Sequence, residues 1–102
     1  MNENTVYIGF SSKAQSALRY RGIDKHQFVK LFALNLAALP FCEESEIDVV
    51  SLTVSKTTLA VVRNLPERRM LVMMEKEIAG KTIEQLKTAM KRRRNYDYEI
   101  LA

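Results

Sequence analysis

Three runs of β-branched and apolar residues in the middle of the chain predict consecutive β-strands. The runs cover residues 47–54, 58–65 and 69–75, and short polar breaks separate them. This spacing is typical of an antiparallel meander. In the first run apolar and polar positions alternate, which favours a strand with one face on a core and one in water. The sequence therefore predicts an antiparallel sheet of three to four strands.

The segments on either side of these runs predict one more strand and three helices. A strand is expected over residues 5–10, and helices are expected over 12–20, 24–39 and 83–94. Each helix opens with Ser, Asp or Thr followed three residues later by Gln, the capping-box pattern. Residues 95–102 either add a short strand or dock on the sheet. The fold class is therefore α+β: an N-terminal strand, two helices, the antiparallel sheet and a C-terminal helix.

The core follows from the same periodicities. The helix over 24–39 repeats apolar residues at the helical period, and the strands repeat them at every second position. The residues expected in the core are Phe28, Leu31, Phe32, Val49, Val61 and Leu71, and the C-terminal helix is expected to bury Ile83, Leu86 and Met90. Arg63 ends a row of apolar positions on its strand. We therefore expect its charge at the edge of the core or in a cleft.

Length and composition restrict the class of protein. The 102 residues suit a single domain spanning 1–102, and no apolar run approaches the ~20 residues that cross a bilayer. We expect a cytoplasmic protein that does not enter a membrane. One cysteine, Cys42, and one histidine, His26, predict neither a disulfide nor a zinc site, and neither residue is expected to be catalytic. No phosphate-binding loop or dinucleotide motif is present, so no metal and no cofactor is expected.

Positive charge is concentrated in one third of the chain. Residues 1–62 hold six Lys or Arg and six Asp or Glu, whereas residues 63–94 hold ten and four, a net charge of +6. Residues 95–102 hold two acids. Such clustering favours a polyanionic partner, most often nucleic acid, although a solvated basic face explains it too.

Arginine and lysine lie close to tyrosine in this basic third and after it. Guanidinium groups match phosphate oxygens and tyrosine rings stack on unpaired bases, a combination typical of proteins that bind RNA or single-stranded DNA. The candidate nucleic-acid-binding residues are Arg68, Lys91, Arg92, Arg94 and Tyr98. We expect the arginines of residues 68–69 and the cations of residues 91–94 to form one continuous patch.

Residues 10–24, FSSKAQSALRYRGID, resemble the opening of BrnT-type toxins, which belong to the RelE-like ribonuclease superfamily. A Lys-Ala pair precedes Gly-Ile and a helix cap at the spacing of that family, and the resemblance continues through the hairpin pattern of residues 55–75. It implies a β-α-α-β-β-β order with a C-terminal helix. It also implies metal-independent RNA cleavage by basic strand residues and a basic or aromatic C-terminal segment. The corresponding catalytic positions are Arg63, Arg69, Arg93 and Tyr96.

The chain departs from that family at three places. Arg21 replaces its histidine, Ala17 replaces its asparagine, and a longer C-terminal helix replaces its Ser-Ala-Arg segment. These departures bear on activity more than on fold. Three functions therefore stay open: a toxin-like endoribonuclease, a non-catalytic nucleic-acid-binding regulator, and a small inhibitor or interaction protein of the mobile-element kind. Expected partners are RNA or single-stranded nucleic acid, with a cognate antitoxin, another protein or a second copy of the chain as alternatives.

Overall fold

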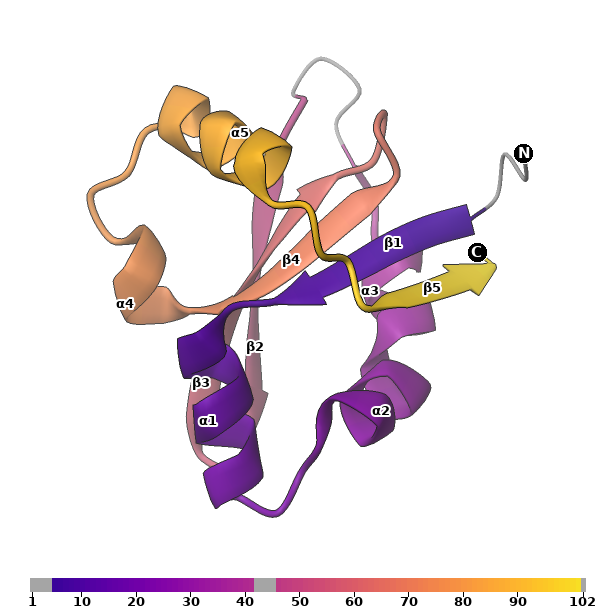
Figure 1. Ribbon diagram of the computed structural model, residues 1–102, viewed down its shortest axis with the longest axis vertical. Helices are drawn as coiled ribbons and strands as arrows, with labels where there is room; N and C mark the ends of the chain where they lie inside the picture. Colours follow the sequence, from indigo (N-terminus) through magenta and orange to yellow (C-terminus); the bar gives the residue numbers. More distant parts are fainter. Residues whose placement is uncertain (1–4, 42–45, 102) are drawn as a thin grey trace.

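The computed structural model describes residues 5–41 and 46–101, so Cys42 and the acids Glu43 and Glu44 lie outside the described residues (Figure 1). The strands are β1 (Thr5–Phe10), β2 (Asp48–Val54), β3 (Thr57–Asn64), β4 (Arg69–Met74) and β5 (Tyr98–Leu101). The helices are α1 (Ser12–Tyr20), α2 (Lys25–Phe28), α3 (Leu34–Ala38), α4 (Glu75–Ile78) and α5 (Ile83–Arg92), and a π-helical turn, η1 (Val29–Ala33), joins α2 to α3. The predicted α+β class is confirmed.

The five strands form one mixed sheet in the order β2-β3-β4-β1-β5. The three central runs of the sequence pair antiparallel as predicted, β2 with β3 and β3 with β4. The N-terminal strand β1 adds to β4 in parallel, and the C-terminal residues form β5, which pairs antiparallel with β1. The sheet is therefore larger than the three to four antiparallel strands expected, because the two ends of the chain extend it at the same edge.

Helices cover both faces of this sheet. Figure 1 shows α1 and α2 on one side of the strands and α4 and α5 on the other. On the first face Phe10, Phe28 and Val61 belong to the larger core cluster, and on the second Leu71 and Leu86 belong to a smaller one. Because β3 lies between both layers, nearly all of its side chains are buried. The second face carries the C-terminal end of α5, where the chain is most basic.

Two of the three predicted helix caps form as expected, and the third lies one residue earlier. Asp24 and Thr82 both form capping boxes, with Gln27 and Gln85. The helix α1 is capped by Ser11 rather than by the first residue of the helix, because the Ser11 hydroxyl accepts a hydrogen bond from the backbone N–H of Ala14 at 3.1 Å. The chain then leaves α1 through Gly22, whose φ of +78° suits glycine.

The helical segment from α2 to α3 buries a different stripe from the predicted one. Phe28 is buried and Phe32 half-buried, but Leu31 is 62% exposed, so its placement in the core was wrong. The cause is the π-helical turn η1, whose backbone hydrogen bonds join residues five apart instead of four. The residues that face the core after this turn therefore lie farther along the chain than a regular α-helix would place them. Ala33 is buried in consequence.

Two other core predictions fail for reasons of position. Val49 lies on the second face of the edge strand β2 and is 38% exposed, whereas alternate residues of that strand pack on the first face. Ile83 is exposed because it lies in the first turn of α5, before the helix reaches the sheet; Leu86 and Met90 are buried as predicted. Val61 and Leu71 are buried as expected.

The guanidinium of Arg63 is fully buried, with 1% of the residue exposed. It donates from Nη1 to the carbonyls of Leu36 (2.7 Å) and Leu39 (3.0 Å), and from Nη2 to that of Pro40 (3.0 Å). Its Nε donates to Oδ1 of Asp48 at 2.8 Å, and Nη2 also pairs with Oδ2 of Asp48. Arg63 therefore caps the C-terminal end of α3 from near the end of strand β3.

Loss of this side chain should strongly destabilise the fold. We expect Arg63→Met to lower the free energy of unfolding by about 3 to 5 kcal/mol, because three carbonyls at the end of the helix and the Asp48 carboxylate would lose their hydrogen-bond donor. Asp48→Asn should cost only about 1 to 3 kcal/mol, since the carbonyl bonds persist. Urea unfolding followed by circular dichroism measures both changes, with Lys30→Met as an exposed control. A cost below about 1 kcal/mol for Arg63→Met would contradict this role.

Candidate nucleic-acid interface

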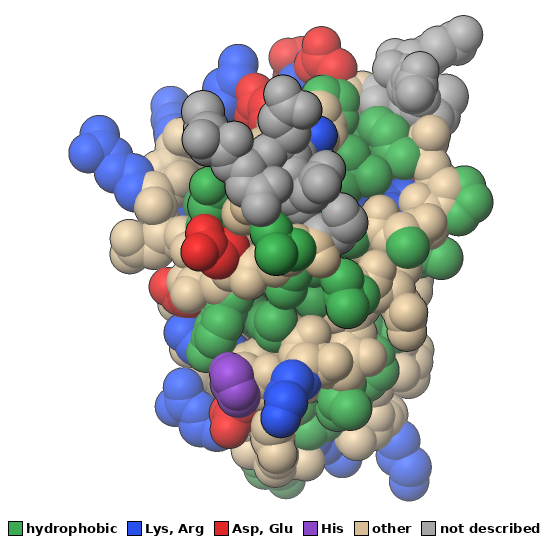
Figure 2. All heavy atoms as spheres, turned by 90° about the vertical axis from the view of Figure 1, so that its right-hand side faces the viewer, with side chains coloured by type: hydrophobic (Ala, Val, Ile, Leu, Met, Phe, Trp, Pro, Cys, Tyr) green, Lys and Arg blue, Asp and Glu red, His purple; other side chains and the backbone are tan. Residues whose placement is uncertain are grey.

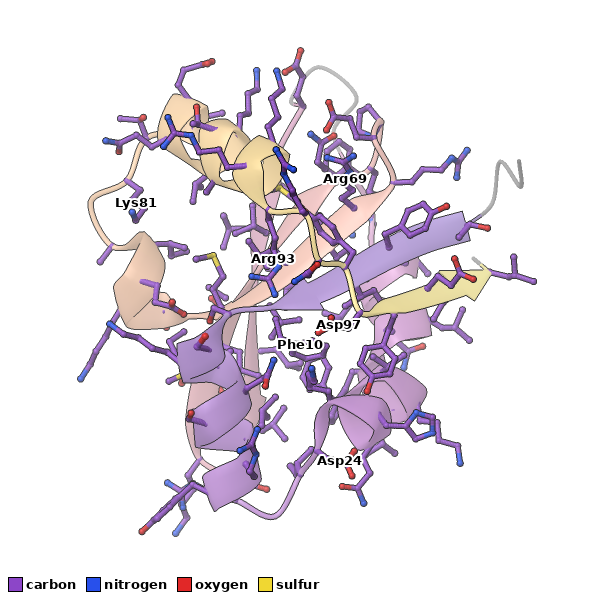
Figure 3. All side chains as sticks on the ribbon, in the orientation of Figure 1. Phe10, Asp24, Arg69, Lys81, Arg93 and Asp97 are labelled. Carbon is purple, nitrogen blue, oxygen red and sulfur yellow. The ribbon has the colours of Figure 1, made fainter. Side chains whose placement is uncertain are left out.

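Three of the four residues predicted to be catalytic meet on the second face of the sheet. Arg69 begins β4, Arg93 follows the last residue of α5, and Tyr96 lies in the segment that leads to β5. The guanidinium of Arg69 lies over the Tyr96 ring, 5.4 Å from its centroid. Figure 3 shows Arg69 and Arg93 beside the segment that descends from α5 across β4 and β1. The sheet thus brings together residues that are up to 27 positions apart in the sequence.

Arg93 holds this segment against the sheet. Its Nε donates to the carbonyl of Asn95 at 2.9 Å, and its Nη2 donates to the carbonyl of Phe10 at the end of β1. Gly9 makes the approach possible, because a Cβ there would lie 2.6 Å from Nε of Arg93 and 3.2 Å from the carbonyl oxygen of Asn95. The guanidinium still has unused N–H groups that can face a ligand.

The Tyr96 hydroxyl is already engaged. It donates a hydrogen bond to the carbonyl of Met90, in the last turns of α5, at 3.0 Å. Burial raises the pKa of Tyr96 above the usual 10.0, and the nearby Arg69 and Arg93 only partly oppose that shift. The ring of Tyr96 rather than its oxygen faces Arg69. The hydroxyl therefore ties this segment to α5, while the ring contacts the guanidinium.

Two neighbours of Arg69 were not among the predicted site residues. Glu67, in the β3–β4 hairpin, places a carboxylate oxygen 3.8 Å from Nη1 of Arg69. Tyr7 is the parallel-strand partner of Arg69 and is exposed on the same face. The alternation of β1 was a usable signal for Tyr7, because Val6, Ile8 and Phe10 all point inward. The site therefore offers two tyrosine rings near one arginine.

The C-terminal end of α5 and the β3–β4 hairpin adjoin this cluster. Asn64, Pro66 and Glu67 of the hairpin line a cavity of about 230 Å³ together with Lys87 and Lys91 of α5. Arg68 is exposed at the hairpin tip, and Arg92 and Arg94 are exposed at the helix end. We call the cations of the hairpin tip, β4 and the C-terminal end of α5 with the residues after it the basic face: Arg68, Arg69, Lys91, Arg92, Arg93 and Arg94. That they form one continuous patch stays a prediction.

Acidic residues neutralise one border of the basic face. Lys87 pairs with Glu46 and lies 3.6 Å from Glu84. The hydrogen bond and charge of Lys87 lower the pKa of Glu46, and Glu46 in turn raises the pKa of Lys87. Lys87 is thus engaged within the protein. The cations beyond it, at the helix end, carry the excess charge.

Two predicted site residues lie elsewhere. Arg63 is buried on the first face of the sheet, where all its donors serve α3 and Asp48. Tyr98 also faces that side, where its ring packs edge-on against Phe10 with 6.2 Å between centroids. Lys25 lies over the Tyr98 ring and pairs with Asp97. Neither Arg63 nor Tyr98 joins the basic face.

The arrangement can hold phosphates and stack a base. Arg69 and Arg93 supply fixed guanidinium groups, and Tyr96 and Tyr7 supply rings. A proton-transferring group would have to be Glu67, because the Tyr96 hydroxyl is occupied. No group of three His, Cys, Asp or Glu side chains within residues 5–41 and 46–101 is arranged to hold a metal ion. None of the helices described there has the length and apolar composition to span a membrane.

Comparison with known proteins assigns no family. No family model matches the chain, and no curated protein or solved structure matches it either. Membership of the BrnT-type toxin family stays a prediction.

Removal of the Tyr96 hydroxyl should have a small, pH-dependent effect. We expect Tyr96→Phe to cost about 0.5 to 1.5 kcal/mol near pH 7, the value of one hydrogen bond. Because burial raises the pKa of Tyr96 in the folded state, the unfolded chain loses its proton first, and wild-type stability should fall as pH rises above about 10. That contribution should be missing in Tyr96→Phe. Urea unfolding between pH 8 and 11 tests this, with Tyr20→Phe as the exposed control.

Substitution of Gly9 tests the approach of the Arg93 segment to β1. We expect Gly9→Ala to destabilise the protein by about 1 to 3 kcal/mol, because the added methyl group overlaps the Arg93 side chain and crowds the Asn95 carbonyl. Thermal and urea unfolding measure the effect. The exposed Gly22 cannot serve as a matched control, since its φ is positive. Ser16→Ala on the surface of α1 is the control instead. A stability change like that of the control would place the segment farther from the sheet.

Proposed function

We propose that this chain binds RNA or other single-stranded nucleic acid through the basic face. The observation that carries the proposal is the stack of Arg69 on Tyr96 beside Arg93, on an accessible sheet face bordered by exposed arginines. Stacking on aromatic rings and phosphate pairing by arginine are the two interactions by which proteins hold unpaired nucleotides.

The distribution of charge supports the same proposal. The basic face holds six cations from the hairpin, β4 and the end of α5, and their only ion pair among the described residues is the 3.8 Å contact of Arg69 with Glu67. Figure 2 shows the side of the molecule that carries α2 and α3, where apolar side chains occupy the centre and Lys and Arg lie mainly at the margins. The cations of the basic face are thus largely without an acidic partner within the described part of the chain.

The backbone at Arg68 adds a further argument. Arg68 adopts a φ of 58° at the hairpin tip, a left-handed conformation that costs a non-glycine residue about 1 to 2 kcal/mol. Its side chain is exposed, so the fold gains little from it. Strained residues of this kind collect at functional sites. The presence of arginine at a position where glycine would suit the backbone is consistent with a phosphate contact.

Neutralising part of the basic face should weaken RNA binding specifically. We expect the triple variant Arg69→Gln, Arg92→Gln and Arg94→Gln to bind a single-stranded RNA 12-mer at least about tenfold more weakly at moderate salt, and to flatten the log–log salt slope by about two units. Arg93 is left intact because it supports the fold. Fluorescence anisotropy between 50 and 300 mM salt measures affinity and slope together.

The control removes the same charge elsewhere. Arg19→Gln, Lys30→Gln and Lys81→Gln alter three exposed cations outside the basic face; Figure 3 places Lys81 far from Arg69. Equal losses in both triple variants would mean that net charge alone attracts RNA. Arg68→Gly offers a second test: it should leave stability unchanged or raise it, while lowering RNA affinity.

A second candidate function is metal-independent RNA cleavage, as the resemblance to RelE-like ribonucleases implies. The observation in its favour is the carboxylate of Glu67 beside Arg69, since an acid–base group next to a cation can move the 2′-hydroxyl proton while charge on the phosphorane is stabilised. With enzyme in excess over RNA and EDTA present, Glu67→Gln should then abolish cleavage and Tyr96→Phe should retain it. RNA left intact by the wild-type protein excludes this function and leaves binding.

A further inference from the structure

A groove at the opposite end of the sheet from the basic face has the features of a second binding site. It consists of two adjoining cavities of about 450 and 410 Å³ that share Met74 and Lys76 in their walls. One face of α1 forms one side, and the start of β3 with the β4–α4 junction forms the other. Figure 1 shows α1 beside β3 and below α4. Cavities of this size are typical of sites for small organic ligands.

The lining of the groove is cationic and rich in hydroxyl groups. Four cations border it: Lys13, Arg21, Lys56 and Lys76. The lining hydroxyl groups belong to Ser12, Ser16, Thr57, Thr58 and Tyr20, and Glu75 is the single carboxylate of the described lining. None of the four cations forms an ion pair within the described part of the chain. They are therefore available to an anion.

Arg21 and Tyr20 form an ordered pair at the mouth of the groove. The Nε of Arg21 donates to Oγ1 of Thr57 at 3.2 Å, which fixes the guanidinium against β3. Its Cζ lies over the Tyr20 ring, 5.6 Å from the centroid. The Tyr20 residue is 85% exposed, so the ring contributes little to the core. Tyr20 therefore presents a flat aromatic surface next to an arginine that Thr57 holds in place.

The turn that presents Lys56 is strained. Ser55 and Lys56 adopt φ angles of 48° and 67° in the two-residue connection between β2 and β3, a position at which Asn-Gly is the favoured pair. Two non-glycine residues with positive φ cost stability. The lysine side chain projects from this turn into the lining of the larger cavity. No contact with the core offsets this backbone strain, because both residues are exposed.

We propose that this groove binds a nucleotide, with the base stacked on Tyr20 and the phosphate held by Arg21, Lys56 and Lys76. A ring, a fixed guanidinium and two lysines within one cavity match a ligand that has both a planar base and a phosphate. The same chemistry occurs in a free mononucleotide and in the 5′-phosphorylated end of an RNA strand. The site is separate from the basic face and does not depend on its function.

Titration calorimetry with AMP, adenosine, ribose 5-phosphate and inorganic phosphate tests the proposal. AMP should bind most tightly. Arg21→Gln and Lys76→Gln should each weaken AMP binding about tenfold or more, the loss expected for one charge-assisted contact. Tyr20→Ala should weaken AMP binding at least about fivefold but leave ribose 5-phosphate unaffected. Arg19→Gln is the matched control, because Arg19 lies on the same helix but does not line the groove.

Lys56→Gly separates binding from folding. Glycine relieves the positive φ, so the melting temperature should stay the same or rise while AMP binding weakens. RNA 12-mers with and without a 5′-phosphate distinguish the two sources of the nucleotide: a preference for the phosphorylated strand that Arg21→Gln removes identifies the strand end.

The proposal is overturned if neither AMP nor the 5′-phosphate binds at millimolar concentration, or if Arg21→Gln behaves as Arg19→Gln does. It is independent of the proposed function, because the basic-face triple variant should leave AMP affinity unchanged.

Discussion

The buried guanidinium of Arg63 is the interaction on which the arrangement of layers depends. It lies near the end of β3, and its bonds go to the carbonyls that end α3 and to Asp48, its pairing partner on the edge strand β2. One side chain therefore fixes where the α2–α3 segment ends and where the chain can re-enter the sheet. A buried charge is tolerated only with such complete pairing, and no buried side-chain polar atom of the described residues lacks a partner. An arginine in this position serves the fold, and the cations of the basic face are other residues.

They come from the other face of the sheet, and two features of β1 place them there. Because β1 joins β4 in parallel, Tyr7 lies beside Arg69, and because residue 9 is glycine, the segment after α5 can cross β1 closely enough for Arg93 to reach the Phe10 carbonyl. That segment then pairs as β5 and carries Tyr96 onto Arg69. The candidate interface is thus assembled by strand order, from residues that local sequence does not connect.

Two groups of cations lie at opposite ends of the β3–β4 pair. At one end the hairpin tip meets the C-terminal turn of α5, and at the other the β2–β3 turn meets α1. Both places contain a left-handed, exposed basic residue, Arg68 in one and Lys56 in the other. Each also pairs a guanidinium with a tyrosine ring, at 5.4 Å and 5.6 Å from the centroid. Positive φ angles and exposed cations therefore coincide at both places.

Local patterns in the sequence determined the central meander, the caps at Asp24 and Thr82, the α+β class and the gathering of cations in one third of the chain, because each depends on neighbours within a few residues. Arg69, Arg93 and Tyr96 were named as catalytic positions from the family resemblance, and the structure brings these three together. Only the tertiary structure decided that Arg63 is buried, that Tyr98 faces the core, and that Glu67 and Tyr7 adjoin Arg69. Leu31 was misplaced because a π turn changes the helical period. Val49 was misplaced because it lies on the face of the edge strand β2 that is exposed to solvent. Alternation divides a strand into two faces, but only the layers packed above and below decide which face is the core.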